Sequence, residues 1–96
     1  MLMLVTYDVN TSSSAGQKRL RKVSKLCERY GLRVQNSVFE LLVDAAQLAT
    51  LKAELAATID HDHDSIRFYR LGSNYKNRID AIGRTDLVQT GEPIIL

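Results

Sequence analysis

The order of the apolar patterns along the chain constrains the fold more than any other feature. A short apolar run, Leu2 to Tyr7, precedes a helical pattern, a long β-rich stretch, a second helical pattern and a last β-rich run. Short apolar runs bounded by polar loops are typical of buried strands, whereas apolar residues three and four apart are typical of helices. The sequence therefore predicts the order β-α-β-β-α-β, followed by a tail.

Two capping-box spacings predict where the helices begin. Ser14 is followed three residues later by Gln17, and Asp44 by Gln47. Gly31 is expected to end the first helix, and the second should end before the polar loop 60–64. The apolar faces that follow from these starts are Leu20, Val23, Leu26, Cys27 and Tyr30 in the first helix, and Leu48, Leu51, Leu55 and Ile59 in the second.

The remaining segments predict four strands. The first is expected over about Met1 to Val9, and the stretch Leu32 to Val43 divides into two strands joined near Ser37 to Phe39. The fourth, Ser65 to Leu71, places Ile66, Phe68 and Arg70 on one face. Right-handed crossovers and antiparallel pairing in this order give an α+β, ferredoxin-like sheet with two helices on one face and an open second face.

The 96 residues predict a single domain, with a core over about 1–72 and a tail over 73–96. A core this small gains from oligomerisation. The tail ends Glu92-Pro93-Ile94-Ile95-Leu96, and apolar residues at a chain end indicate a docked strand. Docking of this strand on a second copy would form a twofold homodimer, and docking on its own sheet is the alternative.

Other features limit the class of protein. No apolar stretch approaches the ~18 residues of a membrane span, and the N-terminus carries no secretory signal. The single cysteine, Cys27, cannot form an internal disulfide, which fits the cytoplasm. Because Cys27 lies on the apolar face of the first helix, we expect a packed thiol rather than a nucleophile.

The net charge is only +2, but the charges are segregated along the chain. Residues 17–33 hold seven bases and one acid, whereas residues 40–64 hold six acids and one base. A basic face attracts polyanions whatever the total charge, and a solvated helix face is the alternative. The candidate nucleic-acid contacts are Lys18, Arg19, Arg21, Lys22 and Lys25.

Asp8 is the principal candidate for chemistry. It follows the first apolar run directly and precedes the polar loop 10–13 and the basic helix. A carboxylate at the mouth of a buried strand can hold a hard cation, and nearby bases can hold phosphates. The pattern suggests phosphodiester chemistry or nucleic-acid contact. The alternative, which the residues alone favour, is a loop cap or an Asx-turn with Asn10.

Two further clusters have more ordinary explanations. Alternating His and Asp over 61–64 could ligate zinc or manganese, but polar residues are expected in this loop. After the fourth strand, a polar group either contacts phosphate or covers the edge of the sheet, and we favour the second; its members are Asn74, Tyr75, Lys76 and Arg78.

Four segments together resemble one known family. They are Tyr7-Asp8-Val9; Arg21-Lys22-Val23 with Cys27 and Tyr30-Gly31; Arg33-Val34-Gln35-Asn36-Ser37-Val38-Phe39-Glu40; and Asp64-Ser65-Ile66-Arg67-Phe68-Tyr69-Arg70-Leu71. They are similar to the small CRISPR-associated adaptation endonucleases, the ferredoxin-like subunits that work beside an integrase in spacer acquisition. The resemblance covers residue 1 to about 75.

The resemblance implies a cytoplasmic homodimer. Some members are described as metal-dependent endonucleases acting on RNA or DNA, and others as bridges that hold duplex DNA between integrase subunits. It implies that Asp8 binds Mg²⁺ (or Mn²⁺) and is catalytic, with Tyr7, Arg33 and Phe39 close to the site.

One chain supplies a single carboxylate to such a site. Mg²⁺ needs octahedral oxygen coordination but often takes only one or two carboxylates, so a dimer that joins two Asp8 side chains would complete it. Bound metal would polarise the phosphoryl group and lower the pKa of an attacking water, while Arg33 could stabilise the developing charge. The motif offers no general base.

A third alternative is an RNA-recognition sheet with bases stacked on aromatic side chains. Its candidates are Tyr7, Phe39, Phe68 and Tyr69, but the Arg-Gly-Phe-Gly-Phe type of segment found in such sheets is absent from this sequence.

Overall fold

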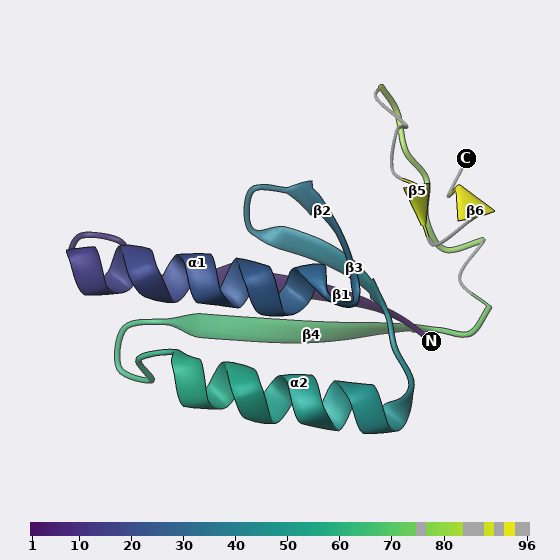
Figure 1. Ribbon diagram of the computed structural model, residues 1–96. Coiled ribbons are helices and arrows are strands. Elements are labelled where there is room, and N and C mark those ends of the chain that lie inside the picture. The colour runs from purple at the N-terminus through teal and green to yellow at the C-terminus, as the bar shows by residue number, and fades with distance from the viewer. Residues whose placement is uncertain (75–76, 84–87, 90–91, 94–96) are drawn as a thin grey trace.

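The computed structural model describes residues 1–74, 77–83, 88–89 and 92–93. One sheet with two helices forms the body of the molecule (Figure 1). The predicted order β-α-β-β-α-β and the ferredoxin-like α+β class are confirmed. The elements are β1 (Leu2–Asp8), α1 (Ser14–Glu28), β2 (Gly31–Gln35), β3 (Val38–Leu42), α2 (Ala45–Thr58) and β4 (Ser65–Gly72), followed by β5 (Val88–Gln89) and β6 (Glu92–Pro93).

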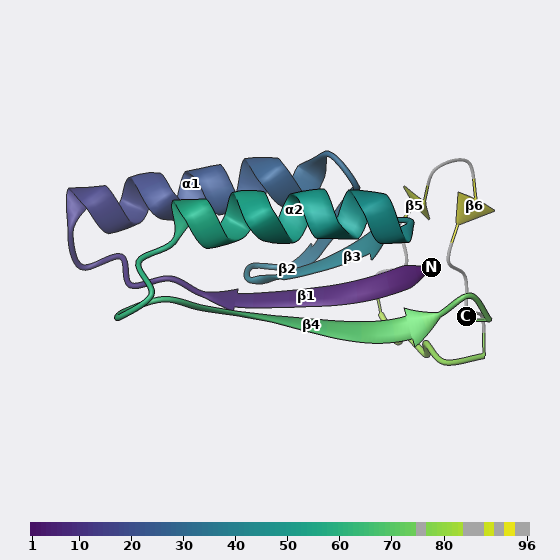
Figure 2. The ribbon, with the colours of Figure 1, turned by 90° about the horizontal axis from the view of Figure 1, so that it is seen from below.

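The main sheet has the strand order β2-β3-β1-β4, with antiparallel pairing throughout. β1 lies between β3 and β4, so that Val5 faces Phe39 on one side and Phe68 on the other. Both helices lie on one face of this sheet (Figure 2). The most apolar run of the chain is therefore the central strand, which the rest of the sheet and both helices bury.

The core lies between the sheet and the helices. Successive side chains of a strand point to opposite faces, so the odd-numbered residues of β1 face the helices and the even-numbered ones face away. Met3, Val5 and Tyr7 pack in the core, and the predicted helical faces are confirmed there by Val23 and Cys27 of α1 and by Leu48, Leu51 and Leu55 of α2.

The capping box at α2 is confirmed, whereas the one predicted at α1 does not form, because the N-cap lies one residue earlier and the residue three positions after it is Gly16. The Asp44 carboxylate accepts from the Gln47 backbone N–H at 2.7 Å, and the Gln47 side-chain oxygen accepts from the Asp44 N–H at 2.9 Å. In α1 the N-cap is Ser13, whose hydroxyl accepts from the Gly16 N–H at 3.1 Å. Gly16 is buried against the preceding loop, where a Cβ would lie 1.9 Å from the Asn10 carbonyl oxygen, and this packing fixes the turn.

Gly31 does not terminate α1, contrary to the prediction. The helix ends at Glu28, and Gly31 is the first residue of β2. A Cβ on Gly31 would lie 1.9 Å from the Glu40 carbonyl oxygen of β3. The glycine is therefore required by the close approach of two strands, not by a left-handed helix end.

The turn between β2 and β3 differs from the sequence analysis, because it falls at Asn36 and Ser37. The Tyr7 backbone N–H donates to the Ser37 carbonyl there. In β4 the predicted face is confirmed: Ile66, Phe68 and Arg70 lie opposite the core-facing residues of β1. Ile66 and Phe68 pack against the core, whereas the Arg70 side chain is exposed.

The tail forms a small ladder of its own. β5 pairs with β6, and β5 approaches β2 of the same chain. The apolar C-terminal residues Ile94 to Leu96 lie outside the described residues, as do Tyr75 and Lys76, so docking of the tail on a second copy stays a prediction. Among the described helices, none has the length and apolar character needed to cross a membrane.

Candidate active site

Asp8 is the last residue of β1 and lies opposite Ser65 of β4. Because its neighbour Tyr7 points into the core, Asp8 points to the sheet face that carries no helix, and its side chain is exposed. Within the described ranges its carboxylate makes no hydrogen bond or ion pair. The Asx-turn in the following loop is made by Asn10, whose side-chain oxygen accepts from the Ser12 N–H at 3.0 Å.

Asp8 lies in an open hollow of about 390 Å³ on this face. Its lining combines oxygen donors with one cation, and consists of Thr6, Tyr7, Asp8, Ser37, Val38, Ser65, Arg67 and Tyr69. The Tyr69 hydroxyl accepts from the Arg67 guanidinium at 3.5 Å. Carboxylate and hydroxyl oxygens are ligands for hard cations, and an arginine suits a phosphate.

The sequence analysis missed Arg67 and Ser65 as members of this hollow. Both sit on β4 at alternate positions, Ser65 opposite Asp8 and Arg67 opposite Thr6. The signal was the two-residue period of β4, which places residues 65, 67 and 69 on the face away from the helices.

The donor set at Asp8 fits half of a magnesium site. Among the residues that the structure describes, no three side chains of the His, Cys, Asp or Glu types are grouped so that they could hold a metal. A cation with several retained waters needs only one or two carboxylates, which Asp8 and a second copy of Asp8 would supply.

Tyr7 lies on the opposite side of the sheet from Asp8. Its ring is buried, and its hydroxyl lies 3.1 Å from both the Ser24 hydroxyl and the Asn36 carbonyl oxygen. These contacts tie β1 to α1 and to the β2–β3 turn. Consecutive residues of a strand cannot share a face, so the motif places Tyr7 in the core and Asp8 in solvent.

Arg33 and Phe39 lie with Tyr7 on the helix side. Phe39 is fully buried, with its ring centroid 6.0 Å from that of Tyr7. The Arg33 guanidinium stacks 5.4 Å above the Phe39 ring and lies 3.9 Å from a Glu28 carboxylate oxygen. Within one chain the sheet therefore separates Asp8 from the other three residues predicted beside it, and their part in catalysis stays a prediction.

Four of the five predicted nucleic-acid contacts form an exposed surface, which we name the cationic α1 face: Lys18, Arg21, Lys22 and Lys25. A hollow of about 390 Å³ between α1 and α2 is lined in part by Lys22, Lys25 and Arg29. A second, of about 310 Å³, lies towards the β2–β3 turn and includes Arg21, Lys25 and Arg33.

Arg19 differs from these four, because its guanidinium is engaged with Asp64. The Arg19 Nε lies 2.8 Å from the Asp64 Oδ2, and the Asp64 side chain is completely buried. Arg19 thus lies inside the fold's polar network rather than on the cationic α1 face.

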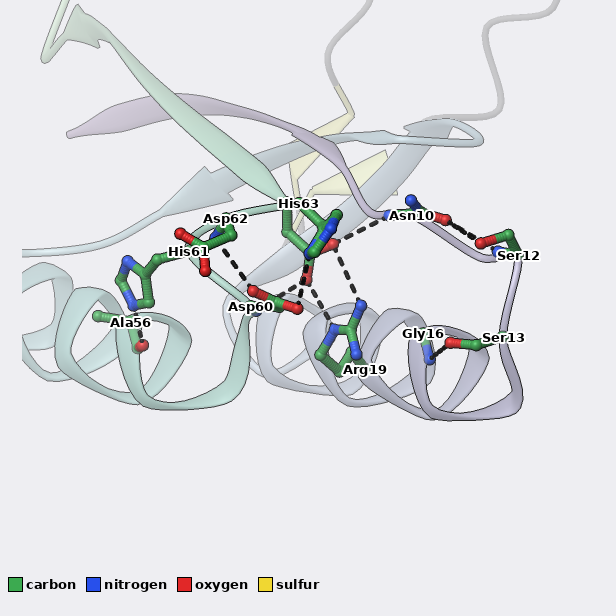
Figure 3. A network of polar contacts seen from close by, with 11 residues as sticks. Asn10, Ser12, Ser13, Gly16, Arg19, Ala56, Asp60, His61, Asp62 and His63 are labelled. Carbon is green, nitrogen blue, oxygen red and sulfur yellow. Dashed lines mark hydrogen bonds and ion pairs between the residues drawn. The ribbon is translucent and has the colours of Figure 1, made fainter.

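The loop 60–64 is a turn, not a metal cluster. The His61 Nε2 lies 2.7 Å from the Ala56 carbonyl oxygen, and the His63 Nδ1 lies 3.0 Å from the Asp60 Oδ2 (Figure 3). The Asp62 N–H donates to Asp60. Both histidine side chains therefore make local contacts, and among the residues that the structure describes the alternating pattern brings no three ligands together.

The fold is that of a small ferredoxin-like protein, and its candidate site is the carboxylate at the end of β1. A solved structure of the same class resembles it closely. The crystal structure of Streptococcus pyogenes Cas2 at pH 6.5 aligns with a TM-score of 0.77 and 55% sequence identity, covering 86% of this chain and 100% of that chain. The chain belongs to the family described as CRISPR associated protein Cas2, whose profile matches residues 1–79.

Curated relatives of the same family are similar to this chain along nearly its whole length. The CRISPR-associated endonuclease Cas2 of Halalkalibacterium halodurans is 56% identical over 95 residues, which cover 99% of both chains. The CRISPR-associated endoribonuclease Cas2 3 of Rhodospirillum rubrum is 52% identical over 95 residues, covering 99% of this chain and 100% of the relative. The family expected from the sequence is confirmed, and by this resemblance the chain is a CRISPR-associated nuclease.

Proposed function

We propose that this chain is a subunit of CRISPR spacer acquisition that works in the cytoplasm as a homodimer and cleaves phosphodiester bonds with Mg²⁺ (or Mn²⁺) at Asp8. One observation carries the proposal. Among the predicted catalytic residues, Asp8 alone points to the sheet face without helices, where its exposed carboxylate lies among hydroxyl groups and an arginine. The free, buried thiol of Cys27 suits a reducing compartment.

The open sheet face supports a dimer. It carries the half-buried apolar side chains Leu4, Val38 and Leu42, which a second copy would cover. Glu40 lies among them, and its burial raises the pKa of its carboxyl group. Its Oε1 has no hydrogen-bond donor in the described part of the chain, so a donor from a second copy would satisfy it. A twofold axis on this face would bring two Asp8 side chains to one site.

The residues of the hollow have distinct tasks in this proposal. When bound, the metal polarises the phosphoryl group and lowers the pKa of a water. Asp8 holds the cation, and Arg67 binds a non-bridging phosphate oxygen and offsets its charge. The described lining contains no histidine and no second carboxylate, so protons pass to solvent and we expect slow turnover.

The cationic α1 face supports binding to RNA or DNA through the backbone. Lysine and arginine contacts to phosphates give affinity without reading sequence, and they depend strongly on salt. The named relatives include both an endonuclease and an endoribonuclease, so both polymers are candidate substrates. An integrase subunit is the proposed protein partner.

The second candidate is a scaffold that positions DNA for the integrase without cleaving it. The separation of Asp8 from the cationic α1 face by the sheet favours this alternative, because a duplex lying along α1 is not delivered to Asp8 of the same chain. An RNA-recognition sheet is not supported: Tyr7 and Phe39 are buried and Phe68 packs on the core, which leaves Tyr69 as the stacking surface.

The experiment that tests the proposed enzyme is the Asp8→Asn substitution, assayed with labelled RNA and duplex DNA in Mg²⁺. We expect cleavage to fall at least about a hundredfold, since the loss of the metal removes its charge stabilisation. The melting temperature should stay unchanged because Asp8 is exposed. Asp62→Asn, an exposed aspartate of the loop 60–64, is the matched control and should cleave normally. Undiminished cleavage by Asp8→Asn would refute the assignment.

The scaffold is tested by reversing charges on the cationic α1 face. The double substitution Arg21→Glu and Lys22→Glu should weaken duplex binding and reduce the slope of log K against log salt by about one for each lost phosphate contact. Lys52→Glu, an exposed base on α2, should leave the slope unchanged. Lost cleavage in Asp8→Asn together with intact spacer acquisition would make the scaffold role primary.

A further inference from the structure

The Asp64 side chain connects three parts of the chain that are distant in sequence. Its Oδ2 accepts from Arg19 Nε of α1 at 2.8 Å and from the Asp60 N–H at 2.9 Å. Its Oδ1 accepts from the Asn10 N–H at 3.0 Å and lies 3.5 Å from Arg19 Nη2. Figure 3 shows the Arg19 side chain directed from α1 towards the loop that carries Asp60 and His63, with Asn10 on the neighbouring segment.

The backbone at Asn10 is fixed on two sides by these contacts. Its N–H donates to Asp64, and its carbonyl packs so closely on α1 that a Cβ on Gly16 would lie 1.9 Å from it. Asn10 is two residues beyond Asp8. Asp8 itself lies opposite Ser65, the residue that follows Asp64. The same buried carboxylate therefore anchors the chain just after Asp8 and just before the residue facing Asp8.

The anchor is stiff because the carboxylate is buried and its oxygens are supplied with donors. Burial disfavours the charge on Asp64, but the hydrogen bond from Arg19 and those from the Asp60 and Asn10 N–H groups outweigh it, and its pKa lies below the ordinary value. Satisfied buried networks of this kind hold a single geometry. The Arg19 side chain is 21% exposed, so most of it lies within the fold.

We propose that Asp64 and Arg19 are positioning residues for Asp8: the buried pair fixes the exit of β1 and with it the direction in which the Asp8 carboxylate meets a divalent cation. This inference rests on the proposed function of Asp8. Catalytic geometry tolerates displacements of only a fraction of an ångström, so loosening the segment after Asp8 weakens cation binding although neither partner touches the cation.

The test compares Asp64→Asn with Glu54→Gln in the full-length protein at neutral pH. Both substitutions turn an acid into its amide and break an ion pair between an arginine and a later segment. The arginine is Arg19 within α1 for Asp64, and Arg29 at the C-cap of α1 for Glu54, which pairs with it at 3.2 Å on the surface. Electron paramagnetic resonance measures the affinity for Mn²⁺, and hydrogen exchange measures the opening of the Asn10 amide. For Asp64→Asn we expect exchange at Asn10 to quicken and Mn²⁺ binding to weaken, each about tenfold. Glu54→Gln should match the wild type in both.

Arg19→Lys is the second variant, because lysine keeps the charge but lacks the several N–H donors of the guanidinium. A smaller rise in Asn10 exchange and a smaller loss of Mn²⁺ affinity in this variant would support the inference. This variant alone is decisive if Asp64→Asn does not fold. Folded variants with faster exchange at Asn10 but wild-type Mn²⁺ affinity would show that the pair is structural alone and overturn the inference.

The Asp8→Asn variant, measured beside them, distinguishes failure of the proposed function from failure of the positioning role. If Asp8→Asn binds Mn²⁺ as tightly as the wild type, the proposed function fails and the positioning role falls with it. If Asp8→Asn loses Mn²⁺ while the Asp64 and Arg19 variants retain it, the positioning role alone is refuted.

Discussion

Asp8 and Asp64 are the same residue type at neighbouring strand ends, and their surroundings make them opposite in character. Asp8 is exposed at the end of β1, whereas Asp64 is buried before β4 and accepts hydrogen bonds from Arg19 and two backbone N–H groups. A carboxylate that makes no contact within the described part of the chain keeps its oxygens available to a cation, while a satisfied one serves the fold. Asp64, which the sequence analysis considered among possible metal ligands of the loop 61–64, thus serves the fold.

The burial of Asp64 gives a prediction about acid stability. Its pKa is lowered in the folded state, so its stabilising effect is complete above the unfolded value of about 3.9 and is lost as the pH falls through the folded pKa. Urea unfolding of the wild type should therefore show the free energy of unfolding falling on acidification. Asp64→Asn should be less stable at neutral pH and show a shallower fall of the free energy of unfolding. Parallel curves for Asp64→Asn and the wild type would contradict this account.

Cys27 confirms the expectation of a packed thiol. It is fully buried in α1, and burial, with a smaller effect of Glu28, raises its pKa to about 11. The thiol therefore stays protonated at neutral pH and has no role as a nucleophile.

At the scale of the elements, the start of α1 shows how tertiary packing selects among equal local signals. Ser12, Ser13 and Ser14 are three consecutive candidates for the N-cap, and each has a hydroxyl of the right kind. The structure uses Ser13, whose hydroxyl accepts from the N–H of Gly16, the buried glycine that packs against the Asn10 carbonyl.

The cap is testable by a pair of alanine substitutions. Ser13→Ala should lower the free energy of unfolding by about 1 kcal/mol, because the hydroxyl that accepts from the Gly16 N–H is lost. Ser14→Ala, at the first helical position, should change it by less than about 0.5 kcal/mol. Chemical denaturation measures both. A larger effect at Ser14 would restore the sequence prediction and contradict the observed cap.

The sequence predicted the elements because their signals are local, and it failed where a contact between elements decides. The apolar face Leu48, Leu51 and Leu55 and the Asp44 capping box need nothing outside α2, and both are confirmed. Gly31 carried a local signal for a helix end, yet its role is the close approach to β3, which is visible only in the pairing.

The candidate site was predictable only in part, for the same reason. Asp8 follows from its place at the end of an apolar run. That Arg67 lies on its face depends on the register of β1 with β4. That Arg33 and Phe39 do not lie on it depends on the register of β1 with β3 and of β2 with β3. Arg19 belongs to the basic run in sequence, but its distance of 2.8 Å from the buried Asp64 removes it from the exposed set.

At the scale of the whole molecule, the sheet divides two kinds of surface. The helices cover one face (Figure 2). They carry the exposed bases of the cationic α1 face, while Asp8 and Arg67 belong to the other face. In the proposed function, a single chain therefore offers a polyanion-binding side and, on its reverse, half of a cation site. Completion of that cation site would need Asp8 of another copy of the chain, and this shared site is the central proposal.

The proposal of a shared site is tested most directly with mixtures of wild-type and Asp8→Asn chains that have been allowed to exchange subunits. Electron paramagnetic resonance measures the Mn²⁺ that each mixture binds. If two Asp8 carboxylates share one ion, bound Mn²⁺ falls with the square of the wild-type fraction, to about a quarter at equal mixing, the share of dimers that hold two aspartates. If each chain binds one ion by itself, bound Mn²⁺ falls linearly, to about half at equal mixing, and this result would contradict the shared site. A monomer observed by light scattering under the same conditions would contradict it too.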